Sequence, residues 1–157
     1  MPPSRVILGS DHAGYPLKEK CLTHLREAGY ACEDVGTHSS ASCDYPRFAA
    51  LACRKVLDTG FPGLLICGTG LGMSMSANRF PGIRAALCCD EYLARMARQH
   101  NNANVLCLGA RVMEEDMALA VLDSFLRTEF EGGRHEDRVR LMDDLVRGHA
   151  GHTGEQA

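Results

Sequence analysis

Short apolar runs alternate with segments of helical periodicity along the first two thirds of the chain. Each run is bounded by glycine, proline or polar residues, as is typical of strands, and the five runs lie at 6–10, 31–35, 64–67, 84–88 and 105–109. The run at 31–35 contains Glu33 and Asp34 and predicts a weaker strand than the others. Between the runs, apolar residues recur every three or four positions, as at Leu17, Cys21 and Leu25. Because each strand is followed by a helical segment, the pattern predicts a doubly wound, Rossmann-like α/β fold with a parallel five-stranded sheet and helices on both faces.

Polar residues mark several expected helix boundaries. Asp44 and Asp90 each stand where a helical pattern begins, which is typical of an N-cap residue. The last helical pattern begins near residue 132, and the composition becomes polar and glycine-rich after residue 148. The sequence therefore predicts a single domain over residues 1–148 and a flexible tail over 149–157.

Composition excludes several classes of protein. A formal net charge of −3 argues against a nucleic-acid partner, and no apolar run is long enough to cross a membrane. The eight cysteines contain no C-x-x-C pair, so we interpret most of them as reduced thiols of the core. The sequence lacks a secretory signal and a metal-ligand pattern, and we expect a cytoplasmic protein without a metal site.

The stretch 64–74 changes character at Cys67. An apolar run ends there, and three alternating glycines, Gly68, Gly70 and Gly72, lead into a helical segment. A glycine-rich loop before a helix directs backbone N–H groups and the positive end of the helix dipole toward an anion. A cysteine beside a helix N-terminus is also a position where the thiolate is stabilised. The stretch therefore predicts a base next to an anion-binding loop.

This loop could also be a nucleotide-binding loop or a purely structural turn. Its G-x-G-x-G pattern differs from the G-x-G-x-x-G of dinucleotide-binding loops, and the absence of G-K-[ST] excludes a P-loop. A structural turn needs only one or two glycines, and a single cysteine such as Cys67 is more often an inert core thiol. The three glycines beside the thiol favour a ligand site over both of these interpretations.

Other polar residues follow strands at the same predicted edge of the sheet. Asp11 and His12 follow the first strand, Tyr45 opens the second helix, and Arg111 follows the fifth strand. Taken singly, Asp11 and His12 are better interpreted as a helix-start carboxylate and a surface histidine, and Tyr45 is consistent with a supporting role. Because doubly wound sheets bind ligands beyond the carboxyl ends of their strands, the shared edge favours one site.

His100 shares a helix face with Leu93 and Met96, which favours a half-buried core histidine. The polar residues Asn101 and Asn102 follow it directly and weaken that interpretation.

Arg134 and Arg138 lie one helical turn apart, where like charges repel by roughly 0.2–0.5 kcal/mol. Glu131, Glu136 and Asp137 could neutralise them. Alternatively, a phosphate could lie between the two guanidinium groups, because arginine binds phosphate through paired N–H donors.

Six motifs together resemble the type B ribose-5-phosphate isomerases and the related galactose-6-phosphate isomerases. They are Gly-Ser-Asp-His-Ala-Gly at 9–14, Asp-Tyr-Pro at 44–46, Ile-Cys-Gly-Thr-Gly-Leu-Gly at 66–72, Gly-Ile-Arg-Ala-Ala at 82–86, Arg-Gln-His-Asn-Asn-Ala-Asn at 98–104 and Gly-Gly-Arg-His-Glu-Asp-Arg at 132–138. The resemblance covers nearly the whole chain. It implies interconversion of ribose 5-phosphate and ribulose 5-phosphate in the pentose phosphate pathway, without a metal or cofactor.

The resemblance also implies roles for individual residues. Cys67 is the expected base, Thr69 and the glycine N–H groups hold the enediolate oxygen, and His100 is the acid that opens the furanose ring. Asp11 is expected to move protons between the sugar oxygens. The expected sugar contacts are His12, Tyr45, Gly68, Gly70, Gly72, Ser74 and Asn101, and the expected phosphate ligands are His12, Arg111, Arg134 and Arg138.

Chain order separates two of these residues. Cys67 ends a strand, whereas His100 and Asn101 end a helix that leads into a strand, so they lie at opposite edges of a parallel sheet. A strand of five or six residues is roughly 17–20 Å long, which is too far for one sugar phosphate to contact both edges. The sequence therefore predicts a homodimer, or a dimer of dimers, in which two subunits share each site.

Three other functions remain open. The substrate could be a six-carbon sugar phosphate such as allose 6-phosphate or galactose 6-phosphate. The chain could instead be a non-catalytic sugar-phosphate-binding protein, although the retained Asp11, Cys67 and His100 argue against this. A thiol redox role for Cys67 is disfavoured, because no C-x-x-C partner is present.

Overall fold

A parallel five-stranded sheet forms the centre of the molecule, in a computed structural model that describes residues 3–150 and the side chains of residues 3–148. The strands are β1 (Arg5–Ser10), β2 (Ala31–Asp34), β3 (Gly63–Cys67), β4 (Ala85–Leu87) and β5 (Val105–Gly109). Their order across the sheet is β2-β1-β3-β5-β4, and every neighbouring pair is parallel. The predicted doubly wound α/β fold is confirmed.

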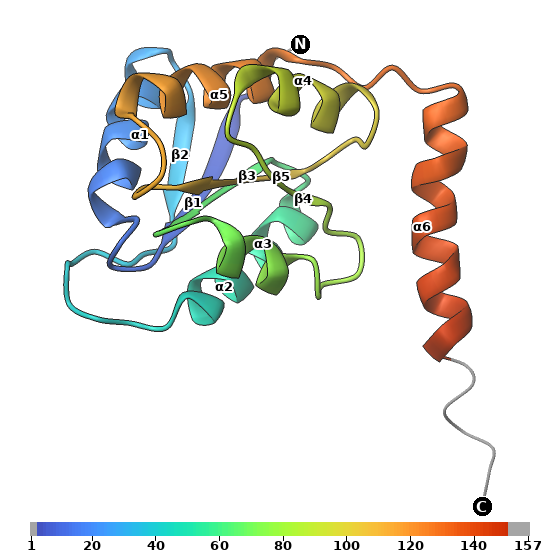
Figure 1. Cartoon of the computed structure of the whole chain (residues 1–157), viewed down its shortest axis with the longest axis horizontal. Coiled ribbons are helices and arrows are strands. Elements are labelled where there is room, and N and C mark those ends of the chain that lie inside the picture. The colour runs from blue at the N-terminus through green and yellow to red at the C-terminus, as the bar shows by residue number, and fades with distance from the viewer. Residues whose placement is uncertain (1–2, 151–157) are drawn as a thin grey trace, which may run out of the picture.

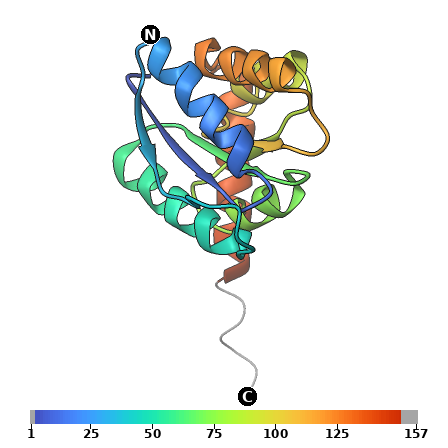
Figure 2. The same ribbon diagram turned by 90° about the vertical axis from the view of Figure 1, so that its left-hand side faces the viewer.

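Helices cover both faces of this sheet (Figures 1 and 2). One face is covered by α1 (Tyr15–Glu27), α4 (Glu91–Gln99) and α5 (Glu115–Arg127), and the other by α2 (Tyr45–Thr59) and α3 (Leu71–Ala77). Side chains of β3 alternate between the two cores: Leu64 and Ile66 pack with the first group of helices, and Leu65 and Cys67 with the second. Because both faces of β3 are buried, its sequence is an uninterrupted apolar run.

The two predicted helix-start carboxylates behave differently. Asp90 Oδ1 accepts a hydrogen bond from the backbone N–H of Leu93 at 2.7 Å, which confirms its role as N-cap of α4. Asp44 occupies the N-cap position of α2, but its side chain makes no capping hydrogen bond there. Its carboxylate instead lies 3.6 Å from Nε of Arg47, one turn into the helix.

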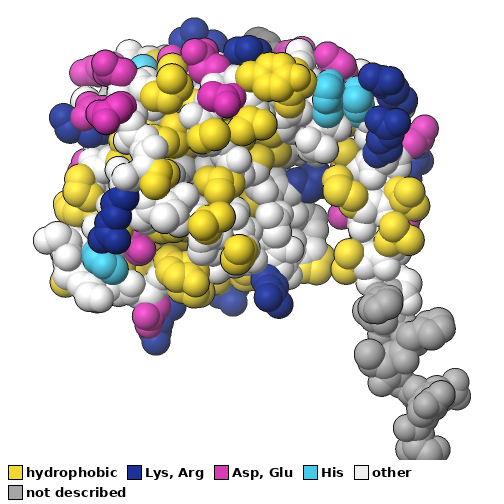
Figure 3. Space-filling model, in the orientation of Figure 1, with side chains coloured by type: hydrophobic (Ala, Val, Ile, Leu, Met, Phe, Trp, Pro, Cys, Tyr) yellow, Lys and Arg dark blue, Asp and Glu magenta, His cyan; other side chains and the backbone are white. Residues whose placement is uncertain are grey.

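The last helix, α6 (Arg134–Ala150), extends away from the sheet beyond its first turn (Figure 1). It carries exposed hydrophobic side chains beyond its basic first turn (Figure 3), including Leu141, Leu145 and Val146, each more than half exposed. The helix continues two residues into the tail predicted for 149–157, and residues 151–157 lie outside the described residues. Within residues 3–150, every helix is too short or too polar to cross a membrane.

Candidate active site

The carboxyl ends of β1 and β3 lie side by side at the point where the chain order across the sheet reverses. Such a point forms a ligand crevice in doubly wound sheets. Asp11 follows β1 there, and its backbone N–H donates to the carbonyl of Ile66 at 3.2 Å. Its buried carboxylate accepts a hydrogen bond from the Gly14 N–H at 2.9 Å. Asp11 therefore supports the start of α1 and also lies against the end of β3.

Cys67 ends β3 at the base of the glycine-rich loop. Its thiol is 5 % exposed, and Sγ accepts a hydrogen bond from the Gly70 N–H at 3.2 Å. The loop then enters α3, where Oγ1 of Thr69 accepts from the Leu71 N–H at 3.3 Å and Oγ of Ser74 donates to the Leu71 carbonyl at 3.0 Å. Because the first N–H groups of a helix lack intrahelical partners, this loop offers donors to an oxyanion next to a thiol.

Close packing explains two of the three loop glycines. Gly70 has a φ of 79°, and a Cβ there would lie 2.4 Å from Cδ1 of Leu87. A Cβ on Gly72 would lie 2.7 Å from Cζ of Tyr45, so the tyrosine ring covers the loop at this point. Tyr45 therefore limits the space beside the loop.

Two basic side chains border the same loop. Of these, Arg111 contacts the loop directly, whereas Nδ1 of His12 accepts a hydrogen bond from the Cys43 N–H at 3.2 Å, in the segment before α2, so Nε2 carries the proton in the neutral ring. The Arg111 N–H donates to the Gly68 carbonyl at 2.9 Å. The Arg111 side chain then passes over the loop, where a Cβ on Gly68 would lie 3.3 Å from its Nη1.

The remaining predicted site residues lie at the opposite edge of the sheet. His100 ends α4, and Asn101 opens the loop that leads into the start of β5. Within this loop, the Asn104 carbonyl accepts from the N–H of Gly63, the first residue of β3. Cys67 is the last residue of the same strand, and a strand of this length is about 17 Å long. One chain therefore places His100 and Cys67 at opposite ends of β3.

Two arginines hold the loop after His100 in place. Nε of Arg84 donates to the Asn102 carbonyl at 2.9 Å, and Arg98 donates to the Ala103 carbonyl. Nε of Arg98 also donates to the Thr128 carbonyl at 3.2 Å, which ties the end of α4 to the segment after α5. Both guanidinium groups therefore bind backbone carbonyls of this loop. Their hydrogen bonds help to hold Asn102 in a left-handed conformation, with a φ of 45°, which residues other than glycine rarely adopt.

Arg134 and Arg138, in the first turns of α6, form no ion pair with a described carboxylate. Glu131 instead lies 3.7 Å from Nε2 of His135, and Asp137 pairs with Arg140 at 2.6 Å. The interpretation in which nearby acids neutralise the two arginines is therefore not supported within the part of the chain whose side chains are described. Both cations remain available to an anion from outside the chain.

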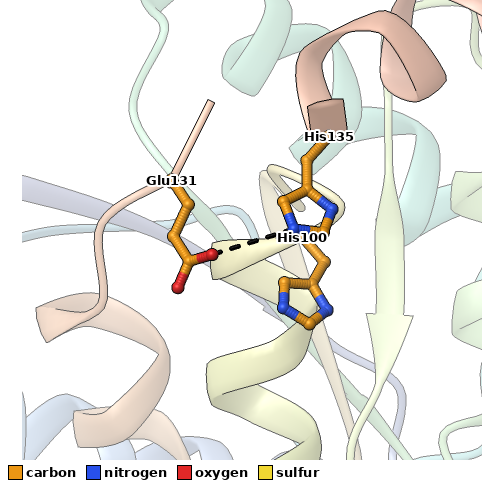
Figure 4. Close-up of side chains that lie close together, drawn as sticks. All are labelled: His100, Glu131 and His135. Carbon is orange, nitrogen blue, oxygen red and sulfur yellow. Dashed lines mark ion pairs between the residues drawn. The ribbon is translucent and has the colours of Figure 1, made fainter. Parts of the chain in front are cut away.

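His135 lies between these arginines in sequence, and the sequence interpretation assigned it no role. Its ring stacks on that of His100, with ring centroids 4.2 Å apart and planes inclined by 10° (Figure 4). Burial, His100 and the neighbouring arginines lower the pKa of His135, while Glu131 partly opposes them. No local pattern indicates this contact, because the two histidines are 35 positions apart and meet only through the tertiary fold.

A groove of about 490 Å³ lies between α6 and the segment that leads from α3 into β4. Its walls include Phe80, Ile83 and Asn101 on one side and Met142 and Val146 of α6 on the other. Hydrophobic side chains on both walls leave apolar surface in contact with water in the single chain.

Comparisons with known proteins show which family the sequence and the fold resemble. The family model described as Ribose/Galactose Isomerase matches residues 6–142. Ribose-5-phosphate isomerase B of Escherichia coli (strain K12) is 43% identical over 139 residues, which cover 88% of this chain and 93% of the relative.

Solved structures show the same likeness. The structure of Clostridium thermocellum ribose-5-phosphate isomerase B has a TM-score of 0.90 and 45% identity, and the match covers 92% of this chain and 99% of that chain. The structure of the Mycoplasma genitalium ribose-5-phosphate isomerase B, solved with bound ribulose-5-phosphate, has a TM-score of 0.87 and 40% identity. This second match covers 91% of the present chain and 96% of the Mycoplasma chain.

Proposed function

Because the chain belongs to the ribose/galactose isomerase family, and its relatives are type B ribose-5-phosphate isomerases, we propose that it interconverts D-ribose 5-phosphate and D-ribulose 5-phosphate. The observation that carries the proposal is the position of Cys67. Its sulfur lies at the end of β3, accepts the Gly70 N–H, and adjoins the N-terminus of α3. A base and an oxyanion-binding loop thus occupy one crevice, as proton transfer next to a carbonyl requires.

The reaction begins with opening of the furanose ring. His100 donates a proton to the ring oxygen, the bond from C1 to that oxygen breaks, and the C1 hydroxyl passes its proton to the Asp11 carboxylate as the C1 carbonyl forms. Asp11 is the group that moves protons between the sugar oxygens. General acid catalysis of this kind contributes about 10²–10⁴ in rate.

Isomerisation follows at C1 and C2. The Cys67 thiolate removes the C2 proton of the aldose, and the electron pair passes through a cis-enediolate to the C1 oxygen. Thr69 and the N–H groups of Gly68, Gly70 and Gly72 stabilise that negative charge. Return of the proton to C1, with transfer of the O2 proton, gives the ketose. Tyr45, Ser74 and Asn101 contact the sugar, and the phosphate is bound by His12, Arg111, Arg134 and Arg138.

A second copy of the chain completes each site in this proposal. Asp11, Cys67 and Arg111 come from one subunit, and His100, Arg134 and Arg138 from its partner. The support is the placement of these two groups at opposite ends of β3, together with the apolar surface that α6 exposes. A two-fold dimer would bring each half beside the complementary half of the other subunit.

An isomerisation assay of the wild type and Cys67→Ser tests the proposed base. We expect the wild type to convert ribose 5-phosphate, and Cys67→Ser to lose about 10²-fold or more in kcat, because a hydroxyl is a far weaker base than a thiolate. Cys89→Ser, which alters an exposed thiol, is the matched control and should keep wild-type turnover.

Two results would count against this proposal. Undiminished turnover by Cys67→Ser would remove Cys67 as the base. Faster turnover of allose 6-phosphate than of ribose 5-phosphate would move the activity to six-carbon substrates, which the family description also admits through galactose.

A further inference from the structure

The stacked pair of His100 and His135 joins two elements that both carry proposed site residues. His100 is the C-terminal cap residue of α4, and His135 lies in the first turn of α6 between Arg134 and Arg138. Their rings lie almost parallel, with centroids 4.2 Å apart. His135 is 7 % exposed, whereas His100 is only half-buried, so the inner ring supports the outer one (Figure 4).

Backbone contacts hold both rings in register. The Glu131 N–H donates to the Gln99 carbonyl at 3.1 Å, which fixes the segment before α6 to the last residue of α4. The His135 N–H donates to the Gly132 carbonyl at 3.1 Å, and the His100 N–H donates to the Met96 carbonyl at 2.9 Å. The two backbone segments that carry the rings are therefore hydrogen-bonded to each other, which fixes the position of one ring relative to the other.

The ring geometry argues against a metal site. Donor atoms of His100, Glu131 and His135 all lie within 4.8 Å of one another, close enough for a metal ion. An imidazole lone pair lies in the plane of its ring, however, and two rings stacked at 10° direct their lone pairs along nearly parallel planes. The arrangement is instead typical of two stacked aromatic rings, in which each ring restricts the orientation of the other.

We propose that His135 is a positioning residue for the reaction: its ring stacks on His100 and fixes the plane from which His100 delivers a proton to the sugar ring oxygen. This inference rests on the proposed function, in which His100 is the ring-opening acid. Orientation matters because the acid has to lie within about 2.6–3.2 Å of the atom that it protonates.

The charges around His135 agree with a neutral ring. His100 faces it from the end of α4, Glu131 from the preceding segment, and Arg134 and Arg138 from α6. Burial, His100 and the two arginines lower the pKa of His135, and Glu131 acts in the opposite direction. A second positive charge stacked on His100 would oppose protonation of that acid. A neutral His135 orients His100 without this penalty.

Three variants separate stacking from other roles. His135→Phe keeps a planar ring without a titrating group, His135→Leu fills similar space without a plane, and His135→Ala removes the ring. His100→Ala is the benchmark for loss of the acid. Glu136→Gln, an exposed change in the same turn of α6, is the matched control.

Two assays on the full-length protein distinguish ring opening from proton transfer. The first measures conversion of ribose 5-phosphate, which has to be opened. The second measures exchange of solvent deuterium into C1 of ribulose 5-phosphate by NMR, which needs Cys67 but no ring opening, because this ketose is an open chain.

We expect His135→Ala and His135→Leu to lower kcat for ribose 5-phosphate about tenfold or more, with KM nearly unchanged and deuterium exchange within about twofold of wild type. His135→Phe should restore most of kcat. In a His100→Ala background, His135→Ala should cause no additional loss, because the acid that it orients is absent.

Several outcomes would overturn the inference. Unchanged kcat in His135→Ala and His135→Leu, equal losses in conversion and exchange, or a His135→Phe variant as impaired as His135→Leu would each reject a stacking role. Failure of the proposed function is visible separately, because the wild type would then convert no ribose 5-phosphate. Full turnover in His100→Ala would instead remove His100 as the ring-opening acid. If His135→Ala does not fold, the comparison of His135→Leu with His135→Phe decides the question.

Discussion

At the scale of single residues, the electrostatic repulsion between Arg134 and Arg138 points to an anionic ligand. The two guanidinium groups lie one helical turn apart and pair with no described carboxylate, although acids stand on both sides of them. Like charges at this spacing repel by roughly 0.2–0.5 kcal/mol. A bound phosphate would remove the repulsion and use the planar donors of both side chains.

Replacing either arginine should therefore weaken substrate binding. We expect Arg134→Ala and Arg138→Ala each to raise KM for ribose 5-phosphate about tenfold or more, because a hydrogen bond to a charged group contributes about 1.5–3 kcal/mol. The change in kcat should be small, since the phosphate is bound in the ground state and in the transition state alike.

Arg140→Ala is the control for charge on the same helix. Its guanidinium already pairs with Asp137, so its removal should leave KM near the wild-type value. A large loss of kcat at unchanged KM in Arg134→Ala or Arg138→Ala would contradict a phosphate-binding role.

The thiols illustrate which residue properties can be predicted from sequence. All eight cysteines are free, and five of them are buried, which agrees with the expectation of reduced core residues. Burial raises the pKa of Cys53 to about 11 and that of Cys88 to about 12, so these thiols stay protonated near neutral pH. Apolar neighbours in the sequence were enough to predict that most of the cysteines lie in the core, because burial follows the periodicity of each element. The rise in pKa depends on the depth of burial and was not predicted.

At the scale of elements, local patterns predicted the strands and helices but not how they meet. The five predicted runs became β1 to β5, and the clearest of them, β3 and β5, are buried on both faces and therefore apolar throughout. The strand order β2-β1-β3-β5-β4 depends on packing between distant segments and was not predicted. The same holds for the His100 and His135 stack, and for Asp44, whose side chain pairs with Arg47 instead of capping α2.

The junction between α4 and α6 should be sensitive to acid. The pKa of His135 is lowered by burial, by His100, and by Arg134 and Arg138, with Glu131 acting in the opposite direction. The folded protein therefore binds fewer protons at this site than the unfolded chain does. The stability contributed by a neutral His135 is present above the unfolded pKa of about 6.5 and is lost as the pH falls below it.

Thermal unfolding followed by circular dichroism at pH 7.5 and pH 5.5 measures this loss. We expect the wild type to lose more Tm on acidification than His135→Phe, which has no titrating ring at the stack. His24→Phe is the histidine control, because His24 pairs with Asp123 on another part of the surface. An equal acid-induced decrease in wild type and His135→Phe would show that protonation of His135 does not weaken the junction.

At the scale of the whole molecule, the proposed catalytic groups divide into two separate halves. Asp11, Cys67 and Arg111 lie where the strands end, and His100 lies where they begin, beside the first turn of α6. The helix α6 stands off from the sheet and exposes Leu145 and Val146 to solvent (Figure 1). Exposed apolar surface of this kind favours a second subunit, and the division of the site gives that subunit a chemical role.

Mixing two inactive variants tests this division directly. In a dimer of Cys67→Ala and His100→Ala chains, one site would combine the intact Cys67 of one subunit with the intact His100 of the other, and the second site would lack both. Random exchange at equal concentrations makes half of the dimers mixed, so activity per chain should recover to about one quarter of wild type. Asp11→Asn mixed with Cys67→Ala is the control: both changes fall in the same half, every site keeps one defect, and no recovery is expected. If subunits exchange, as native mass spectrometry can establish, and the first mixture still recovers nothing, each chain has to build its site alone.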